Sequence, residues 1–180
     1  TGNTGSFAAL SNTTGTILDL NETVETPGKA FAPLTGFITF TAAPDIRLDL
    51  TAIQPGTFSS ADCFAPAAAG QTCTPPGFGN GVANPFNLSN TSTTTSSASI
   101  TVFGNAVNTL TGETDAFVGI FSTQFTVPYQ TLLSEVASGT VPTSYSGTFN
   151  ATVVPEPGTL ILLGSGFIGL YAIRRRRNVS

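Results

Sequence analysis

The stretch SYSGTFNATV, residues 144–153, alternates strictly between two kinds of residue. Tyr145, Gly147, Phe149, Ala151 and Val153 fall on one side of an extended chain, and Ser, Thr and Asn fall on the other. Successive side chains of a β-strand point to opposite faces of the sheet, so this pattern predicts a strand with one buried and one wet face. Antiparallel sheets commonly have one solvated face.

Other segments of the chain repeat the same period. Ile46, Leu48 and Leu50 alternate with polar residues, as do Ala98, Ile100 and Val102. Turn residues, such as Gly and Pro, separate the runs. Further strands are predicted at Gly15–Leu20, Gly36–Ala42 and Asp115–Thr126. The Ser/Thr-rich run Thr91–Ser99 is either a linker or the exposed start of a strand.

One segment of the body has helical spacing. Between Pro128 and Ala137, apolar residues recur at i, i+3, i+4 and i+7, namely Tyr129, Leu132, Leu133 and Val136. This spacing places them on one helix face. We therefore predict an all-β body over residues 1–154, an antiparallel β-sandwich or jelly-roll-like domain with one short helix.

Composition excludes several classes of function. The chain of 180 residues has 9% charged residues and no His, Trp or Met. Residues 1–154 carry two basic and nine acidic residues, a net charge of −7, which argues against nucleic-acid binding. Without His we predict no metal site and no cofactor. Since the sequence holds no initiator Met, we expect that a removed secretory leader preceded Thr1.

The two cysteines, Cys63 and Cys73, lie in a loop-like stretch rich in Ala, Pro and Gly. In an exported protein, a disulfide that closes this loop is the default expectation. The alternative is two free buried thiols.

The C-terminal segment 155–180 differs from the body. Pro155, Glu156 and Pro157 form a stiff, extended segment, because the two prolines fix φ. An uncharged stretch, residues 158–173, follows and predicts a transmembrane helix. A cluster of four basic residues then ends the apolar stretch and predicts a stop to membrane transfer. The positive-inside rule places this cluster in the cytoplasm. Its members are Arg174, Arg175, Arg176 and Arg177. The alternative is an amphipathic or core helix of a soluble protein.

In this order, the three parts of the segment resemble a PEP-CTERM sorting signal. The resemblance implies export by a Gram-negative bacterium that makes exopolysaccharide. It also implies recognition by exosortase, a membrane-embedded peptidase or transpeptidase, with Pro155, Glu156 and Pro157 as the recognition motif. The protein is then held transiently in the inner membrane with its body in the periplasm, before it reaches the cell surface or extracellular matrix.

The body offers few groups for catalysis. Asp45 and Asp49 share a strand face with Arg47 between them, which favours a solvated face over a glycosidase pair. Glu113 and Asp115 indicate a polar turn rather than a Ca²⁺ site. A Ser–Lys dyad would depend on Lys29, the single lysine. We therefore predict that the protein is not an enzyme.

Sugar binding commonly uses exposed aromatic platforms, but Tyr129 and Tyr145 occupy predicted core positions. The Asn-x-Ser/Thr sequons favour a glycosylated or glycan-contacting surface. They begin at Asn12, Asn21, Asn87, Asn90, Asn150 and Asn178. The predicted function is thus a non-catalytic surface or exopolysaccharide-matrix protein. The alternatives are a self-assembling filament or sheath subunit and a glycan-binding adhesin module.

Overall fold

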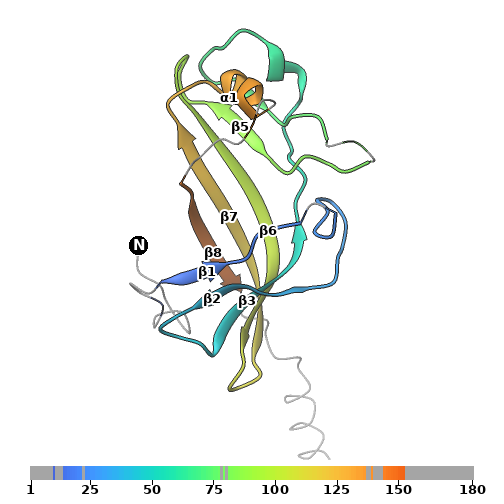
Figure 1. Ribbon diagram of the computed structural model, residues 1–180, viewed down its shortest axis with the longest axis vertical. Coiled ribbons are helices and arrows are strands. Elements are labelled where there is room, and N and C mark those ends of the chain that lie inside the picture. The colour runs from blue at the N-terminus through green and yellow to red at the C-terminus, as the bar shows by residue number, and fades with distance from the viewer. Residues whose placement is uncertain are drawn as a thin grey trace, which may run out of the picture.

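The computed structural model describes residues 10, 14–21, 23–77, 79, 81–136, 139 and 144–152. Strands dominate this part of the chain, together with one α-helix and one short 3-10 helix (Figure 1). In chain order the elements are β1 (Gly15–Ile17), β2 (Leu34–Phe40), β3 (Ile46–Ile53), η2 (Ala61–Phe64), β4 (Thr72–Cys73), β5 (Asn87–Asn90), β6 (Ser96–Asn108), β7 (Thr114–Phe125), α1 (Tyr129–Val136) and β8 (Ser146–Thr152).

The named strands form one antiparallel sheet of eight strands, organised around β6. One edge of β6 pairs with β5 near its start and with β3 from Val102 onward. The other edge pairs with β7 along almost the whole length of β6, and β8 pairs with β7. Beyond β3 the order continues to β2 and β1, and beyond β5 to β4.

Two irregularities in the pairing bend the sheet. The register shifts between Leu34 and Ile38 in β2, where Gly36 has φ +69°, and again between Leu50 and Ala52 in β3. Bulges of this kind bend a strand and increase its twist. In Figure 1, β3 runs beside its partner β6, and β1, at the far edge of this part of the sheet, crosses in front of β7 and β8.

The main hydrophobic core lies between these crossing parts of the sheet. Phe37 of β2 meets Phe121 of β7 edge to face, with ring centroids 6.0 Å apart. Each such side chain contributes about 1.5–3 kcal/mol when it is fully buried. The buried members of this core are Phe37, Ile38, Leu48, Leu50, Ile53, Val102, Ala106, Phe117 and Phe121.

The structure confirms the predicted antiparallel all-β class with a short helix, but it corrects the predicted sandwich. The described strands belong to one curled sheet rather than to two stacked sheets. The physical reason is that β6, which has 13 residues, is long enough to pair with both β3 and β5 on one edge. The sheet can therefore continue around the core without a break.

Several predicted elements are present, although β4, β5 and the part of β6 after Val102 were not predicted. The predicted helix is α1, in which Tyr129 and Leu132 are buried and Leu133 packs against them, whereas Val136 is 57% exposed. The first predicted strand is shorter, since β1 ends at Ile17. Thr91 and its neighbours form a turn, and β6 begins at Ser96, so this run does contain the start of a strand. That start is not exposed as predicted, since Ser96 is 1% exposed.

No helix within the described residues is long and apolar enough to cross a membrane. The predicted transmembrane helix at 158–173 lies outside the described residues, as do the other predicted parts of the segment 155–180.

Candidate functional site

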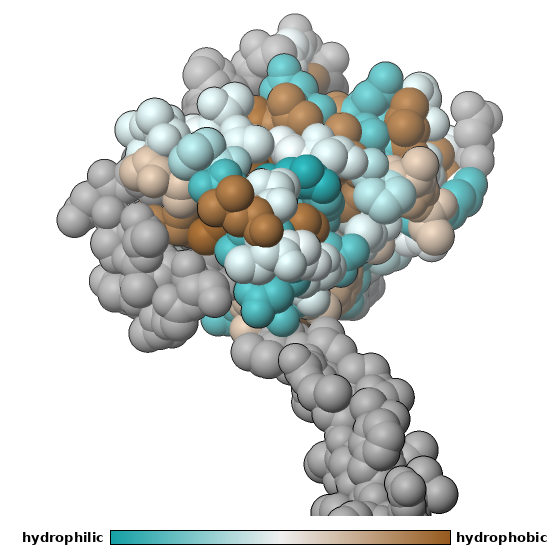
Figure 2. All heavy atoms as spheres, turned by 90° about the horizontal axis from the view of Figure 1, so that it is seen from below, coloured by the Kyte–Doolittle hydropathy of each residue, from teal (hydrophilic) through white to brown (hydrophobic). Residues whose placement is uncertain are grey.

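The end of β8 leads directly into the segment with the sharpest sequence signal. Thr152, its last residue, pairs with Ala116 close to the β6–β7 turn. Pro155, Glu156, Pro157 and Arg174–Arg177 follow beyond the described residues. Seen from this end of the molecule, hydrophobic residues reach the surface in small groups between hydrophilic ones (Figure 2). The segment 155–180 is thus joined to the fold through an edge strand.

The opposite end of the sheet holds the two cysteines. Cys63 in η2 and Cys73 in β4 form a disulfide, as predicted, with Cα atoms 5.1 Å apart. Both residues have no exposed surface. They form a second hydrophobic cluster with Leu88, Ala98, Tyr129 and Leu132. The disulfide therefore fastens the 61–73 loop beneath α1.

A buried asparagine also joins α1 to this end of the sheet. Asn90, at the end of β5, is 1% exposed, and its Oδ1 accepts a hydrogen bond from the backbone N–H of Tyr129 at 3.0 Å. Its Nδ2 donates to Gln130 Oε1 at 3.0 Å and to Gln71 Oε1 at 3.3 Å. Asn90 thus satisfies a free N–H in the first turn of the helix, as a capping residue does.

Tyr129 is the group in this cluster whose ionisation is most affected by the fold. Its side chain is fully buried, and its hydroxyl donates to the backbone oxygen of Asp62 at 3.1 Å. Burial, and secondly the charge of Asp62, raise the pKa of Tyr129 above its usual value. The predicted core position of Tyr129 is confirmed.

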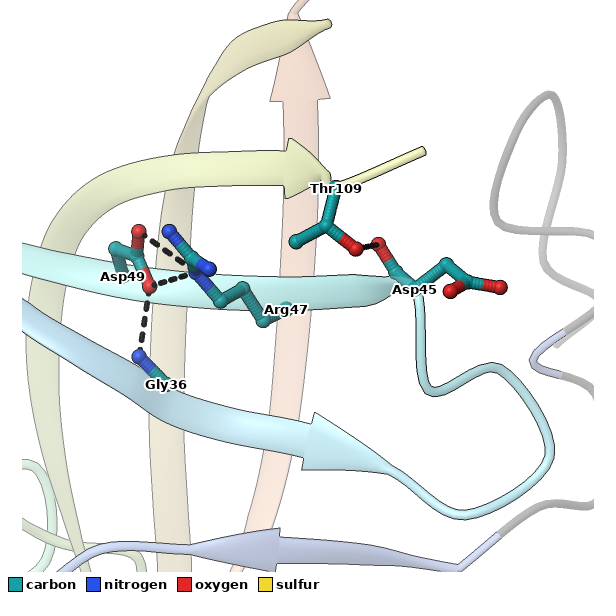
Figure 3. Close-up of polar contacts among 5 residues, drawn as sticks. All are labelled: Gly36, Asp45, Arg47, Asp49 and Thr109. Atoms are coloured by element: carbon teal, nitrogen blue, oxygen red, sulfur yellow. Dashed lines mark hydrogen bonds and ion pairs between the residues drawn. The ribbon is translucent and has the colours of Figure 1, made fainter. Parts of the chain in front are cut away.

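The carboxylates of Asp45 and Asp49 do not face each other. Asp49 is only 7% exposed; its Oδ1 accepts from Arg47 Nε at 2.9 Å and from the Gly36 N–H at 2.7 Å (Figure 3). The Asp45 carboxylate points away from Asp49, and its backbone oxygen accepts from Thr109. The predicted solvated face is therefore wrong for Asp49, since Arg47 and β2 cover it.

The remaining candidate polar groups lie in turns. Glu113 lies in the β6–β7 turn, where its Oε2 accepts from the Thr111 hydroxyl at 3.0 Å, and Asp115 follows in β7. This arrangement fits the predicted polar turn. Lys29 is exposed between β1 and β2. In the part of the chain that is described, no three His, Cys, Asp or Glu residues lie close enough to hold a metal ion.

The sequons differ in accessibility. Asn21 and Asn150 are exposed and Asn87 is half-buried, whereas the Asn90 side chain is enclosed in the hydrogen-bond network beside α1. The structure thus leaves Asn90 unsuited to carry a glycan. Asn12 and Asn178 lie outside the described residues.

An apolar pocket of about 330 Å³ opens on the inner side of the sheet. Ile17 and Leu20, in and just after β1, line it together with Phe37, Ile100 and Phe121. Tyr145 also lines the pocket and packs edge to face on Phe121, but it is 58% exposed, so its predicted core position is wrong. Asp19 and Tyr145 are the ionisable residues of the lining. A lining that is mainly apolar suits the binding of an apolar group.

Comparison with known families gives a match at the C-terminus. The family model of the PEP-CTERM protein-sorting motif matches residues 153–177. The chain carries a PEP-CTERM sorting motif. Its matched region starts one residue after β8 ends and includes all three predicted parts. No curated protein and no solved structure was found to match the chain.

Sequence analysis missed several buried polar residues, of which Asn90 and Glu25 make the clearest contacts. Asn90 stands in a sequon, which favours an exposed position, and no local pattern marks it as a helix cap. Glu25 is 6% exposed, and its Oε2 accepts from the Asn21 N–H at 2.7 Å. The Asn21–Glu25 spacing of four residues was the available signal for this local turn.

Proposed function

We propose that this protein is exported and processed by exosortase into a non-catalytic protein of the cell surface or exopolysaccharide matrix. The observation that carries the proposal is the position of the PEP-CTERM motif, which starts directly after the last strand of the body. By this reading, residues 158–173 hold the precursor in the inner membrane, with Arg174–Arg177 in the cytoplasm. The body then occupies the periplasm until it is released or transferred.

The disulfide supports an oxidising destination. Cys63 and Cys73 are bonded and buried, and the bond closes a loop at the end of the sheet opposite to Thr152, where β8 ends. Disulfides persist in the periplasm and outside the cell but are rare in the cytosol.

The surroundings of the carboxylates support a role without catalysis. A general acid and a general base must share a cleft in which both can reach a substrate. Asp49 is bound by Arg47 and by the backbone of β2, and Asp45 is directed elsewhere. The apolar pocket has Asp19 as its one carboxylate lining residue. These arrangements favour a binding or structural surface.

The test is the intact mass and location of the native protein in a wild-type strain and in a strain without exosortase. We expect a product without the Arg cluster outside the wild-type cell, and a full-length, membrane-bound chain in the deficient strain. A Glu156→Ala variant should behave like the deficient strain if the motif is read directly. Glu135→Ala, at an exposed position in α1, removes a carboxylate outside the motif and serves as the matched control. An identical mass in the two strains would refute the proposal.

A self-assembling extracellular subunit is the second candidate. The edge strand β8 favours it, since its residues 146–148 and Asn150 are exposed. The glycan-binding alternative stays a prediction from the sequons.

A further inference from the structure

Strand β8 ends the sheet on one side. Its inner edge pairs with β7 from Ser146 to Thr152, and no strand of the described residues pairs with its outer edge. Residues 144–148 and Asn150 are exposed. About half of the N–H and C=O groups of such a strand point away from its one partner. These groups form a template onto which a further strand can pair.

The β8 edge lacks the features that prevent pairing in other proteins. Edge strands are commonly protected by charged residues, especially Lys, by Pro, by bulges or by short length. The sequence of β8 is SGTFNAT, with seven residues and neither charge nor Pro, and its register with β7 is regular. The other two edge strands are short, since β1 has three residues and β4 has two.

The strand is also complementary to itself. An antiparallel pair of two β8 strands centred on Phe149 places Thr148 opposite Asn150 of the second copy, so polar residues meet on the outer face. On the inner face, Gly147 lies opposite Ala151, and both are small. The body has a net charge of −7, but none of that charge lies on β8, so the two edges can approach without like charges meeting directly.

We propose that β8 is a self-association surface, through which two copies of this chain join their sheets edge to edge around a two-fold axis. The same patch serves both copies, as a closed dimer requires. Backbone hydrogen bonds supply the attraction, as in other cases of strand addition.

The direction of pairing links this surface to processing, and this step rests on the proposed function. Antiparallel strands place the two Thr152 ends at opposite ends of the paired region, about 20 Å apart for six residue steps. The sorting motif follows each Thr152 immediately. Two precursors that are anchored in one membrane could form this pair only with both β8 strands lying along the membrane, because the two chains leave the pair in opposite directions. Removal of the anchor lifts this constraint on the dimer.

The test is crosslinking of a Thr148→Cys variant on intact cells and in their medium. In the proposed register the two residues at position 148 are diagonal neighbours, about 7–8 Å apart. A thiol crosslinker of that span should join two processed chains. Thr16→Cys is the matched control, because Thr16 is an exposed threonine on the short edge strand β1. The Cys63–Cys73 bond leaves the added cysteine as the reactive thiol.

The same gel separates the two proposals, because the mass of each band reports processing and the doubled mass reports association. A processed chain that crosslinks no more than the Thr16→Cys control overturns the β8 proposal and leaves the proposed function standing. A full-length chain that crosslinks at position 148 as well as the processed chain overturns the link between processing and association, but retains the β8 contact. Cells and medium that hold only full-length chain overturn the proposed processing.

Sizing of the unmodified protein provides a second measurement that needs no cysteine variant. The processed chain should change from monomer to dimer as its concentration rises. A Thr148→Lys variant should associate at least ~10-fold more weakly, because it places two like charges near each other across the edge. Thr16→Lys should leave association unchanged. A wild-type chain that stays monomeric at every concentration overturns the proposal.

Discussion

Removal of the Cys63–Cys73 bond should lower stability by an amount that the loop length sets. The cysteines are separated by 10 positions in the sequence. In the chain-entropy model, closing a loop of that length costs the unfolded chain about 9 cal/mol/K, or about 2.7 kcal/mol at 25 °C. A Cys63→Ala/Cys73→Ala variant also loses two buried sulfur atoms beside Tyr129 and Leu132, for which we add about 1 kcal/mol.

The assay is thermal unfolding of the purified protein, with and without reductant. A loss of about 3–4 kcal/mol corresponds to a fall in Tm of about 10 °C for a body of this size. Reduction of the wild-type protein should reproduce most of this fall, since it removes the constraint but keeps the sulfur atoms. The double alanine variant serves as the control, because its Tm should not respond to reductant.

The reasoning fails if fully reduced wild-type protein, verified by its mass, unfolds within ~2 °C of the oxidised protein. Reduction of the disulfide would then add little conformational entropy to the unfolded chain. In the folded protein, packing against α1 alone would hold the loop in place.

Two further predictions concern the core and the helix. Gly104→Ala should destabilise the fold by about 3 kcal/mol. The added Cβ would collide with the backbone oxygen of Asp49 and lie 2.5 Å from Cε1 of Phe117. Chemical denaturation measures this loss, and a stability equal to that of the wild type would contradict the prediction. The raised pKa of Tyr129 should make stability fall as pH rises from about 10 through the pKa of the folded state, since the folded protein keeps its proton longer than the unfolded chain. Tyr129→Phe should remove that part of the pH dependence. The measurement is the free energy of unfolding from denaturation curves at pH 8 to 11. If this free energy falls with pH as steeply in Tyr129→Phe as in the wild type, the prediction is wrong.

The strands were predictable from sequence where one face is buried and the other meets water. The period-two pattern of the Ala98–Val102 part of β6 is a local consequence of that contrast. In β8 the contrast is weaker, since Phe149 and Ala151 are only partly buried against the core while Thr148 and Asn150 are exposed. The same reasoning fails at Asp49 in β3, because its burial depends on an N–H from β2 and on Arg47. The alternation of Asp45, Arg47 and Asp49 indicates a solvated strand face. The burial of the Arg47–Asp49 ion pair depends on contacts with β2, which the local sequence does not show.

The arrangement of the strands in one sheet could not be predicted from the sequence for a related reason. Whether strands stack as two sheets or continue as one depends on pairing between distant segments, and β6 pairs with β3 and β5, which are separated by the disulfide loop. The exposure of Tyr145 has the same origin. It precedes an edge strand, so no further strand of the described residues covers it, although its ring rests on Phe121.

The packing of β8 restricts where a processing enzyme can cut without harm to the body. Phe149 packs on Phe117 and Phe121, with ring centroids 5.9 and 5.3 Å away, and its ring lies over Gly119. A cut before Phe149 would remove an aromatic side chain from the core, at a cost of about 3–5 kcal/mol. That loss is a large fraction of the stability of a typical domain. A cut beyond Thr152 removes none of the described elements, so the fold favours processing within the matched motif rather than inside the strand that precedes it.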